Sequence, residues 1–347
     1  MVCISETQND RYINEDINEE NLNPTALLQV RNLTVSVNKD GNIFKILDNI
    51  SFNIEEGEIL GLAGESGCGK SMTALSIPNL LPHGISITEG EIIYKNRVIS
   101  TLNEKEMRSV RGSEISIIFQ DVRQSLNPLV RAGRQITETL EIGGSKNKAE
   151  NKAAALQMLS SLGFDKPERI FNGFPHQLSG GMCQRVMTAI AAIRRPKLLL
   201  ADEPSSSLDE ESQERCMSLL KDMNEKYKMS LLIISHDLSI IHKFTNRYLV
   251  MYAGKIMEEG SSRELFSPLH PYTRALVKAM PGKEKKGSVL ENIPGKIPSV
   301  EDRASGCPYA PRCRKAQDIC RRTFPDEQIT GNRKVYCHFP ETEEANE

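Results

Sequence analysis

The sequence predicts an α/β fold built around a phosphate-binding loop, and three observations indicate it. Short apolar runs typical of buried strands end in polar residues, a glycine-rich loop joins one such run to a helix pattern, and alternating apolar residues near the N-terminus indicate an antiparallel sheet. The loop fits G-x-x-x-x-G-K-[ST] and reads Gly64-Glu65-Ser66-Gly67-Cys68-Gly69-Lys70-Ser71. An apolar run at 58–63 precedes it and a helix pattern from Met72 follows it. This is the context that the motif needs.

The residue types of this loop predict how it binds a nucleotide. Glycines at positions 64, 67 and 69 allow sharp turns, so that backbone N–H groups and the N-terminus of the following helix face the phosphates. Lys70 would reach the β- and γ-phosphates, and the Ser71 hydroxyl would ligate Mg²⁺. Cys68 is expected to be a small filler. We therefore expect residues 64–72 to bind ATP with Mg²⁺.

The chain before the loop divides into a polar lead-in and a sheet. Residues 1–26 are rich in Asn, Glu and Asp and are expected to be disordered. Strand patterns follow at 28–37, 43–47 and 50–54, which predicts an antiparallel sheet. Phe44 could stack on adenine from this sheet, although a place in the core explains it equally well.

Beyond the loop, the apolar strand pattern at 115–119 ends at Gln120. An amide at the end of a buried strand can point into a site at the sheet edge, so Gln120 is a candidate to contact Mg²⁺ or the attacking water. An ordinary loop position is the alternative. Residues from about 126 to 175 are mostly helical by composition. Next, Ser179, Gly180 and Gly181 begin a helix and form a second candidate anion-binding terminus, or a plain N-cap.

Two further strands end in residues suited to phosphate chemistry. The run at 197–201 ends in Asp202 and Glu203, adjacent carboxylates that would repel each other without a cation. We expect Asp202 to hold Mg²⁺, which leaves Glu203 to position or deprotonate water. The run at 230–235 then ends at His236, whose imidazole could donate to the γ-phosphate. A structural role is the alternative for a single histidine.

Length and composition limit the remaining possibilities. The 347 residues predict one large domain with a smaller C-terminal appendage. A net charge of −2 gives no electrostatic case for nucleic acid binding. The longest apolar runs are far below the roughly 20 residues of a membrane span, and no export signal is evident, so we expect a cytosolic chain with reduced cysteines.

Half of the eight cysteines lie in the C-terminal tail, spaced C-x5-C-x6-C-x16-C, and they are Cys307, Cys313, Cys320 and Cys337. Clustered thiols in a reduced protein can close an all-thiolate metal site, which would order a tail too small to fold alone. The spacing differs from the paired C-x2-C of a zinc ribbon. An iron–sulfur cluster, zinc and unliganded thiols are the possible interpretations.

These motifs together resemble the ATP-binding-cassette (ABC) ATPases. The LSGGxxQR pattern at 178–185 discriminates best, because phosphate loops and acidic strand ends occur in many nucleotide hydrolases. The resemblance implies a RecA-like core with an antiparallel β subdomain and a helical subdomain at about 121–178. It also implies a head-to-tail dimer, in which residues 179–181 of one subunit close over the γ-phosphate held by the other. The implied roles are Glu203 as catalytic base, Asp202 as Mg²⁺ ligand, His236 as γ-phosphate clamp, Lys70 as phosphate-binding cation and Gln120 as lever to the membrane subunits.

The C-terminal part is similar to the ATPases of dipeptide, oligopeptide and nickel importers. The matching segments are 251–260, 270–276, 293–298 and 306–313. The resemblance implies an ATPase domain at 27–262 and an extension at 263–347 whose four cysteines hold a [4Fe-4S] cluster, with Zn²⁺ as the alternative. The chain departs from the usual pattern at 122–124 and 205–207, and the first departure lies where membrane subunits should dock.

The expected function is therefore the ATPase subunit of a di- or oligopeptide importer, at the cytoplasmic face of the membrane. The implied partners are two transmembrane permease subunits, an extracytoplasmic substrate-binding protein and a second ATPase, with a heterodimer favoured over a homodimer and no nucleic acid. One alternative is a nickel or metal-chelate importer. Another is a soluble cassette ATPase acting on nucleic acid or ribosomes, which usually carries two cassettes or a long coiled coil. A metal-sensing regulator is disfavoured because every hydrolytic residue is present.

Overall fold

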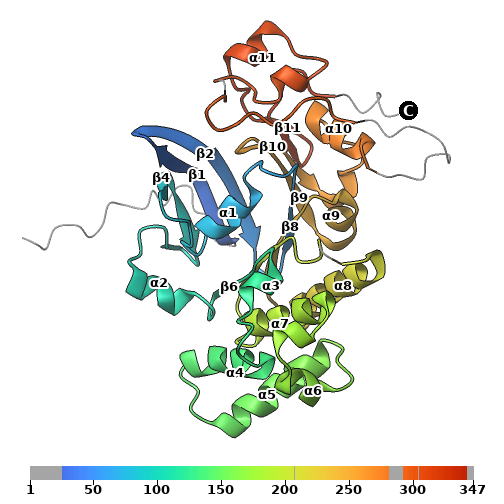
Figure 1. Cartoon of the computed structure of the whole chain (residues 1–347). Helices are drawn as coiled ribbons and strands as arrows, with labels where there is room; N and C mark the ends of the chain where they lie inside the picture. The colour runs from blue at the N-terminus through green and yellow to red at the C-terminus, as the bar shows by residue number, and fades with distance from the viewer. Residues whose placement is uncertain (1–25, 207, 281–291, 304, 342–347) are drawn as a thin grey trace, which may run out of the picture.

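The computed structural model of the chain describes residues 26–206, 208–280, 292–303 and 305–341. The lead-in predicted to be disordered lies outside these residues, apart from Ala26. An antiparallel sheet lies on one side of a larger central sheet, a group of helices lies beyond the end of that sheet, and the C-terminal segment covers the opposite end (Figure 1).

The central sheet has eight strands in the order β11-β12-β10-β9-β3-β8-β7-β6. Its middle is parallel, and β10, β12 and β11 continue it antiparallel. The strands are β3 (Ile59–Ala63), β6 (Ile115–Ile118), β7 (Leu198–Asp202), β8 (Ser230–Ser235), β9 (Arg247–Tyr252), β10 (Lys255–Ser261), β11 (Gln328–Thr330) and β12 (Arg333–Val335). Both faces are covered, as the continuous apolar runs predicted.

Strand alternation divides the core into two apolar clusters. Leu60 and Leu62 of β3 belong to the cluster that includes the antiparallel sheet, whereas Ile59 and Ala63 belong to the cluster that includes the helical layer. Successive strand residues point to opposite faces, so one short strand joins both clusters. The polar groups that follow β3, β6, β7 and β8 are thereby held at one edge of a rigid sheet.

The antiparallel sheet has the order β2-β1-β4-β5. Its strands are β1 (Ala26–Lys39), β2 (Asn42–Glu55), β4 (Ile85–Tyr94) and β5 (Arg97–Val98). The prediction of separate strands at 43–47 and 50–54 was wrong, because β2 runs through both. Leu47 pairs with Val35 and Ile50 with Leu33, so the two residues between them form an irregularity that interrupts the alternation without ending the strand.

The region from about 126 to 175 is helical, as its composition predicted, and contains α4 (Ala132–Ile142), α5 (Lys148–Ser161) and α6 (Pro167–Asn172). Just before and just after this range, α3 (Val122–Ser125) and α7 (Gly180–Ala192) complete the helical layer. The other helices are α1 (Lys70–Ser76), α2 (Glu104–Val110), α8 (Glu210–Tyr227), α9 (Leu238–Phe244), α10 (Pro271–Lys278) and α11 (Asp318–Arg322). Short 3₁₀ turns are η2 (Pro175–Gln177), η3 (Ser262–Glu264) and η4 (Ala310–Arg312). Within the described residues, no helix is long and apolar enough to cross a bilayer.

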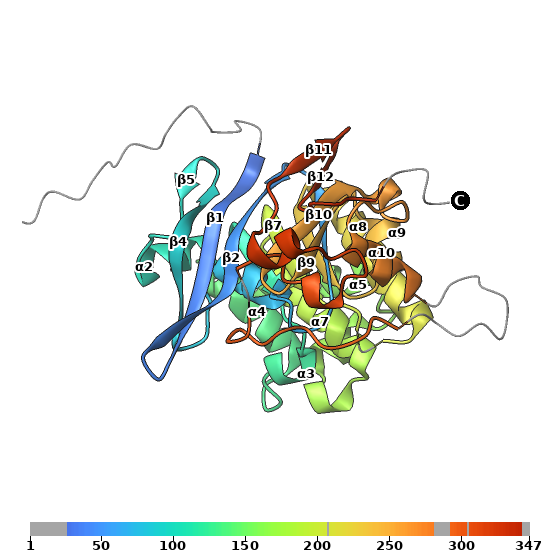
Figure 2. The same ribbon diagram turned by 90° about the horizontal axis from the view of Figure 1, so that it is seen from above.

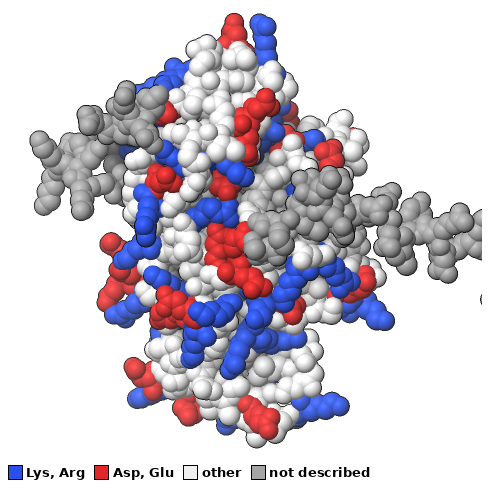
Figure 3. Space-filling view, turned by 180° about the vertical axis from the view of Figure 1, so that it is seen from behind, with Lys and Arg blue, Asp and Glu red and all other residues white. Residues whose placement is uncertain are grey.

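The C-terminal segment packs into the core of the ATPase domain and does not form a separate domain. Strand β12 pairs with β10, and Tyr309 is buried in the same apolar cluster as the helical layer. Seen from above, the described residues after 291 lie across the β9–β10 end of the sheet (Figure 2). Acidic and basic side chains are interspersed over the face opposite to that of Figure 1 (Figure 3).

Candidate functional site

The phosphate loop lies between β3 and α1, and its backbone requires glycine. Gly64 has φ +151°, and a Cβ there would lie 2.3 Å from the carbonyl oxygen of Met251. Gly69, the residue before α1, has φ +115°. A residue with a side chain would be strained at either position, because both have a positive φ. The backbone path of the loop therefore requires glycine at both. The predicted sequence of strand, loop and helix is confirmed.

Lys70 is buried in this loop, with 5% of its surface exposed. Its Nζ donates to the carbonyl oxygens of Gly64, at 2.8 Å, and Glu65, at 3.1 Å. The ammonium is therefore held directly under the turn of the loop. The neighbouring Cys68 is fully buried, as expected for a side chain that fills space, and this burial raises the pKa of its thiol.

The carboxylate of Asp202 lies beside the Ser71 hydroxyl at the end of β7. Asp202 is 6% exposed, and its Oδ1 has no hydrogen-bond partner in the described part of the chain. Burial raises the pKa of Asp202 against the opposing effect of a hydrogen bond with Ser71. An orphaned buried carboxylate oxygen beside a hydroxyl is a donor set that fits Mg²⁺, whose ligands are oxygens.

Glu203 brings the three polar strand ends together. Its Oε2 lies 3.2 Å from Gln120 Nε2 and 3.3 Å from His236 Nδ1. The Glu203 side chain is 13% exposed, whereas that of His236 is 58% exposed. Glu203 adopts a left-handed backbone conformation, with φ +48°, and its N–H donates to the Ile234 carbonyl oxygen. Tertiary contacts hold this strained residue, as is common at functional sites.

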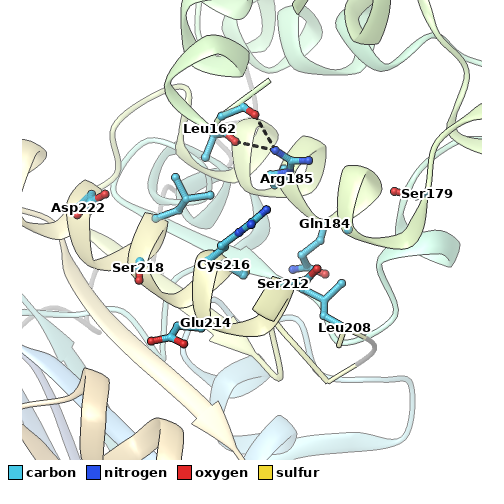
Figure 4. A pocket seen from close by; sticks show the side chains of 14 residues that line it. Leu162, Ser179, Gln184, Arg185, Leu208, Ser212, Glu214, Cys216, Ser218 and Asp222 are labelled. Atoms are coloured by element: carbon cyan, nitrogen blue, oxygen red, sulfur yellow. Dashed lines mark hydrogen bonds between the residues drawn. The ribbon is translucent and has the colours of Figure 1, made fainter. Parts of the chain in front are cut away.

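The LSGG segment lies at a different place. Ser179 caps α7 by accepting from the Met182 N–H at 3.3 Å. Together with Gly181, Arg185 and Leu208 it lines a cavity of about 580 Å³ between α7 and α8 (Figure 4). A Cβ added at Gly180 would meet no atom of the described residues within 4 Å. With respect to that part of the chain, the LSGG segment is therefore an open helix N-terminus.

Comparison with known proteins decides the family. The family model described as "ABC transporter" matches residues 47–206, and that described as "Oligopeptide/dipeptide transporter, C-terminal region" matches residues 257–320. The "Dipeptide transport ATP-binding protein DppD" of Haemophilus influenzae is 41% identical over 322 residues, which cover 92% of this chain and 98% of that protein. The chain belongs to the ABC transporter family.

Other relatives agree with this assignment. A "Probable peptide ABC transporter ATP-binding protein" of Sinorhizobium fredii is 42% identical over 308 residues, covering 87% of this chain and 92% of that protein. Among solved structures, the ATP-binding cassette MJ0796, described as a dimer in a post-hydrolysis state bound to ADP and Pi, is similar with a TM-score of 0.62 and 31% identity. That match covers 68% of this chain and 99% of the cassette. The ABC fold and the ATPase domain predicted from the motifs are confirmed.

The remaining predicted site residues of this ABC protein lie on the phosphate loop, at the start of α1 and on β2. Ser66 and Gly67 are exposed at the loop tip, and Met72 is half-buried against the core. Phe44 is half-buried on β2 and lies outside both buried clusters. Its role in stacking on adenine stays a prediction.

Two residues that hold the phosphate loop were not among those predicted from the sequence. Tyr272 Oη accepts from the Glu65 N–H at 2.9 Å, and Arg312 Nη1 lies 2.7 Å from the Glu65 carboxylate. Both belong to C-terminal segments that the resemblance had matched, but no spacing in the sequence relates them to a loop more than 200 residues earlier. Only tertiary structure reveals them.

The four C-terminal cysteines converge without forming a metal-ion site. All four thiols are free and line one small cavity, together with His270 and Tyr309. Among the residues that the structure describes, no group of three or more His, Cys, Asp or Glu side chains could hold a metal ion. The predicted metal-binding extension is therefore not supported by this arrangement, and neither zinc nor a cluster is established. Burial raises the pKa of Cys307 to about 11 and that of Cys337 to about 12.

Proposed function

We propose that this chain is the ATP-hydrolysing subunit of an importer of di- or oligopeptides. The observation that carries the proposal is the match to the Haemophilus protein, whose printed name is a dipeptide transport ATP-binding protein and which this chain matches over 98% of its length. The match of residues 257–320 to the C-terminal region of oligopeptide/dipeptide transporters supports the same substrate class. The polar residues gathered at the carboxyl edge of the sheet support ATP hydrolysis.

Each of these residues has a proposed role. Residues 64–72 surround the phosphates of ATP, and Lys70, once released from the carbonyls it now contacts, neutralises the β- and γ-phosphates. Ser71 and Asp202 would hold Mg²⁺, with Gln120 as a further ligand. When bound, Mg²⁺ neutralises charge that develops on the phosphate oxygens. Phe44 is the proposed platform for adenine.

The three grouped side chains would act on the attacking water. Glu203 is only 3.2–3.3 Å from Gln120 and His236, so its carboxylate is oriented before substrate arrives. We assign Glu203 as the general base that orients water or takes its proton. His236, being largely exposed, can turn toward the γ-phosphate, and Gln120 links the site to the loop where permease subunits would dock.

Hydrolysis also requires a second subunit. The helix N-terminus at residues 179–181 is open, and a partner's γ-phosphate is the ligand that we propose for it. The description of MJ0796 as a dimer bound to ADP and Pi supports this arrangement. We propose two permease subunits, an extracytoplasmic binding protein and a homologous second ATPase as partners, at the cytoplasmic face of the membrane. A heterodimer is favoured over a homodimer.

Uptake by the reconstituted complex tests the substrate. The chain, its candidate partner ATPase and the permeases would be placed in vesicles with the binding protein, and ATP-dependent uptake of labelled dipeptide, oligopeptide and nickel chelate would be measured. Peptide uptake that stops in a Glu203→Gln complex is the expected result. Uptake of nickel chelate without peptide would replace the proposed substrate class. Recovery of the chain with ribosomes rather than membranes would overturn the transport role.

For the four cysteines we propose a [4Fe-4S] cluster, with Zn²⁺ as the alternative. The chemistry of the donor set supports this, since all four thiols are free and face one cavity of about 20 Å³. That space holds about one water molecule, so the thiols must move apart and lose their protons when a cluster binds. Anaerobic purification with iron, sulfide and zinc counts and an absorbance spectrum tests this. Protein free of all three would refute it.

A further inference from the structure

Arg312 of the C-terminal extension makes a two-point ion pair with the phosphate loop. Its Nη1 lies 2.7 Å from Glu65 Oε2, and its Nη2 lies 3.1 Å from Glu65 Oε1. The Arg312 side chain is 5% exposed and that of Glu65 27% exposed. Parallel N–H···O bonds from one guanidinium to one carboxylate fix both groups in orientation as well as in position.

The remaining hydrogen-bond capacity of Arg312 is used to hold it in place. Its Nε donates to the Pro294 carbonyl oxygen at 2.7 Å and Nη2 to that of Ile293 at 3.2 Å. Nη1 also donates to Tyr252 Oη at 3.2 Å. With the two bonds to Glu65, all five N–H donors of the guanidinium have acceptors. Arg312 is thus a rigid support rather than a surface side chain that happens to meet an acid.

Glu65 is held at every polar group. Its N–H donates to Tyr272 Oη, its carbonyl oxygen accepts from Lys70 and its carboxylate accepts from Arg312. Tyr272 packs in turn against Tyr252 and Tyr309, with ring centroids 4.6 Å and 5.1 Å away. The loop is therefore supported by residues of β9 and of the extension, which includes α10.

The charge of Glu65 makes this support important for nucleotide binding. The loop must receive the triphosphate of ATP, and a carboxylate in the same loop would repel it at short range. A buried guanidinium paired with that carboxylate cancels the repulsion, because partial burial limits screening by solvent and salt. The ion pair also keeps the Glu65 side chain turned toward the extension.

We propose that Arg312 is a positioning residue of the ATP site, which neutralises Glu65 and holds the phosphate loop in its binding shape. This inference rests on the proposed role of residues 64–72 in ATP binding. It makes the C-terminal extension a structural part of the nucleotide site, so that ATP affinity depends on residues 247 positions apart in the chain.

The test measures ATP affinity and unfolding of the full chain with Mg²⁺. Arg312→Gln removes the charge, and the exposed Arg314→Gln is the matched control two positions further on. We expect the dissociation constant for ATP to rise about tenfold to hundredfold in Arg312→Gln, the range for losing hydrogen bonds to a charged group. Arg314→Gln should bind like the wild type.

A double variant separates positioning from general stability. In Arg312→Gln with Glu65→Gln the unpaired carboxylate is gone, so ATP affinity should recover most of its loss even if the midpoint of unfolding stays low. Arg312→Lys, which keeps the charge but loses the two-point geometry, should fall between wild type and Arg312→Gln. If Arg312→Gln does not fold, Arg312→Lys takes its place in the measurement of ATP affinity.

Two outcomes would overturn the inference: wild-type affinity in Arg312→Gln, or a double variant as weak as the single one. Lys70→Ala, measured alongside, tests the underlying site. If Lys70→Ala binds ATP like the wild type, the proposed ATP site itself fails. If Lys70→Ala loses affinity while Arg312→Gln does not, only the role of Arg312 is refuted.

Discussion

The phosphate-loop half and the LSGG half of the site are built in opposite ways. In the first, Lys70 is 5% exposed, and a Cβ at Gly64 would lie 2.3 Å from a backbone oxygen. In the second, a Cβ at Gly180 would meet nothing within 4 Å among the residues that the structure describes, and Ser179 lines a cavity of about 580 Å³. The first half is completed by its own chain, whereas the second is open on one side.

This difference teaches how binding and hydrolysis divide between subunits. On the proposed assignment of residues 64–72, one chain supplies the groups that hold the phosphates, so we expect a single copy to bind nucleotide. The LSGG half offers a helix N-terminus with space before it, which suits a ligand brought by another subunit. Variants that affect one half and leave the other intact test this division.

The largest effect is expected for Glu203→Gln. Turnover should fall by about 10² to 10⁴, the usual contribution of a general base, while ATP affinity is retained because the carboxylate contacts Gln120 and His236 rather than the loop. Steady-state phosphate release and equilibrium binding measure the two quantities. Glu225→Gln, an exposed position on α8, is the control. Near-wild-type turnover in Glu203→Gln would refute the assigned role.

Glycine-to-alanine variants compare the halves directly. Gly64→Ala forces a Cβ into the Met251 carbonyl and should abolish ATP binding by the isolated chain. Gly180→Ala fits sterically in the free chain and should leave folding and ATP binding unchanged. In the assembled complex it should lower turnover on the order of 10- to 100-fold, because a partner's phosphate can no longer approach as closely. Full turnover with Gly180→Ala would place the partner's nucleotide elsewhere.

The smallest effect is expected for Ser179→Ala. Loss of the cap on Met182 N–H should lower the free energy of unfolding by about 1 kcal/mol. Denaturant titration of the isolated chain measures it, with Ser179→Thr as the variant that keeps a capping hydroxyl. A loss that is the same in both variants would mean that the hydroxyl is not what stabilises α7.

Much of the fold and site follows from local pattern. The strand, loop and helix around Lys70 and the strand ends at Asp202, Glu203 and His236 all lie where the sequence predicts them. Each is defined by residues within one element and its flanking turns. The wrong prediction of two strands within β2 has a non-local cause. The bulge there is held by pairing with β1, so it cannot be inferred from the sequence of β2 alone.

The four C-terminal cysteines also show that local pattern does not determine contacts between distant residues. Their spacing predicted a metal site, and the structure brings all four cysteines to one cavity without supporting that site. Spacing does not set the distances between the thiols, which depend on how the segment that carries them packs against β10 and α10. A metal site needs ligand geometry as well as ligand type, and this geometry lies beyond what a spacing pattern contains.

The sequence by itself determined the ABC class, the phosphate loop and the order of polar strand ends, because these depend on residue types at short, fixed separations. Tertiary structure alone decided that Gln120, Glu203 and His236 meet, and that Arg312 and Tyr272 support Glu65. Contacts between distant segments are set by how whole elements pack. A hydrogen bond from residue 312 to residue 65 exists only once the extension has closed over the sheet.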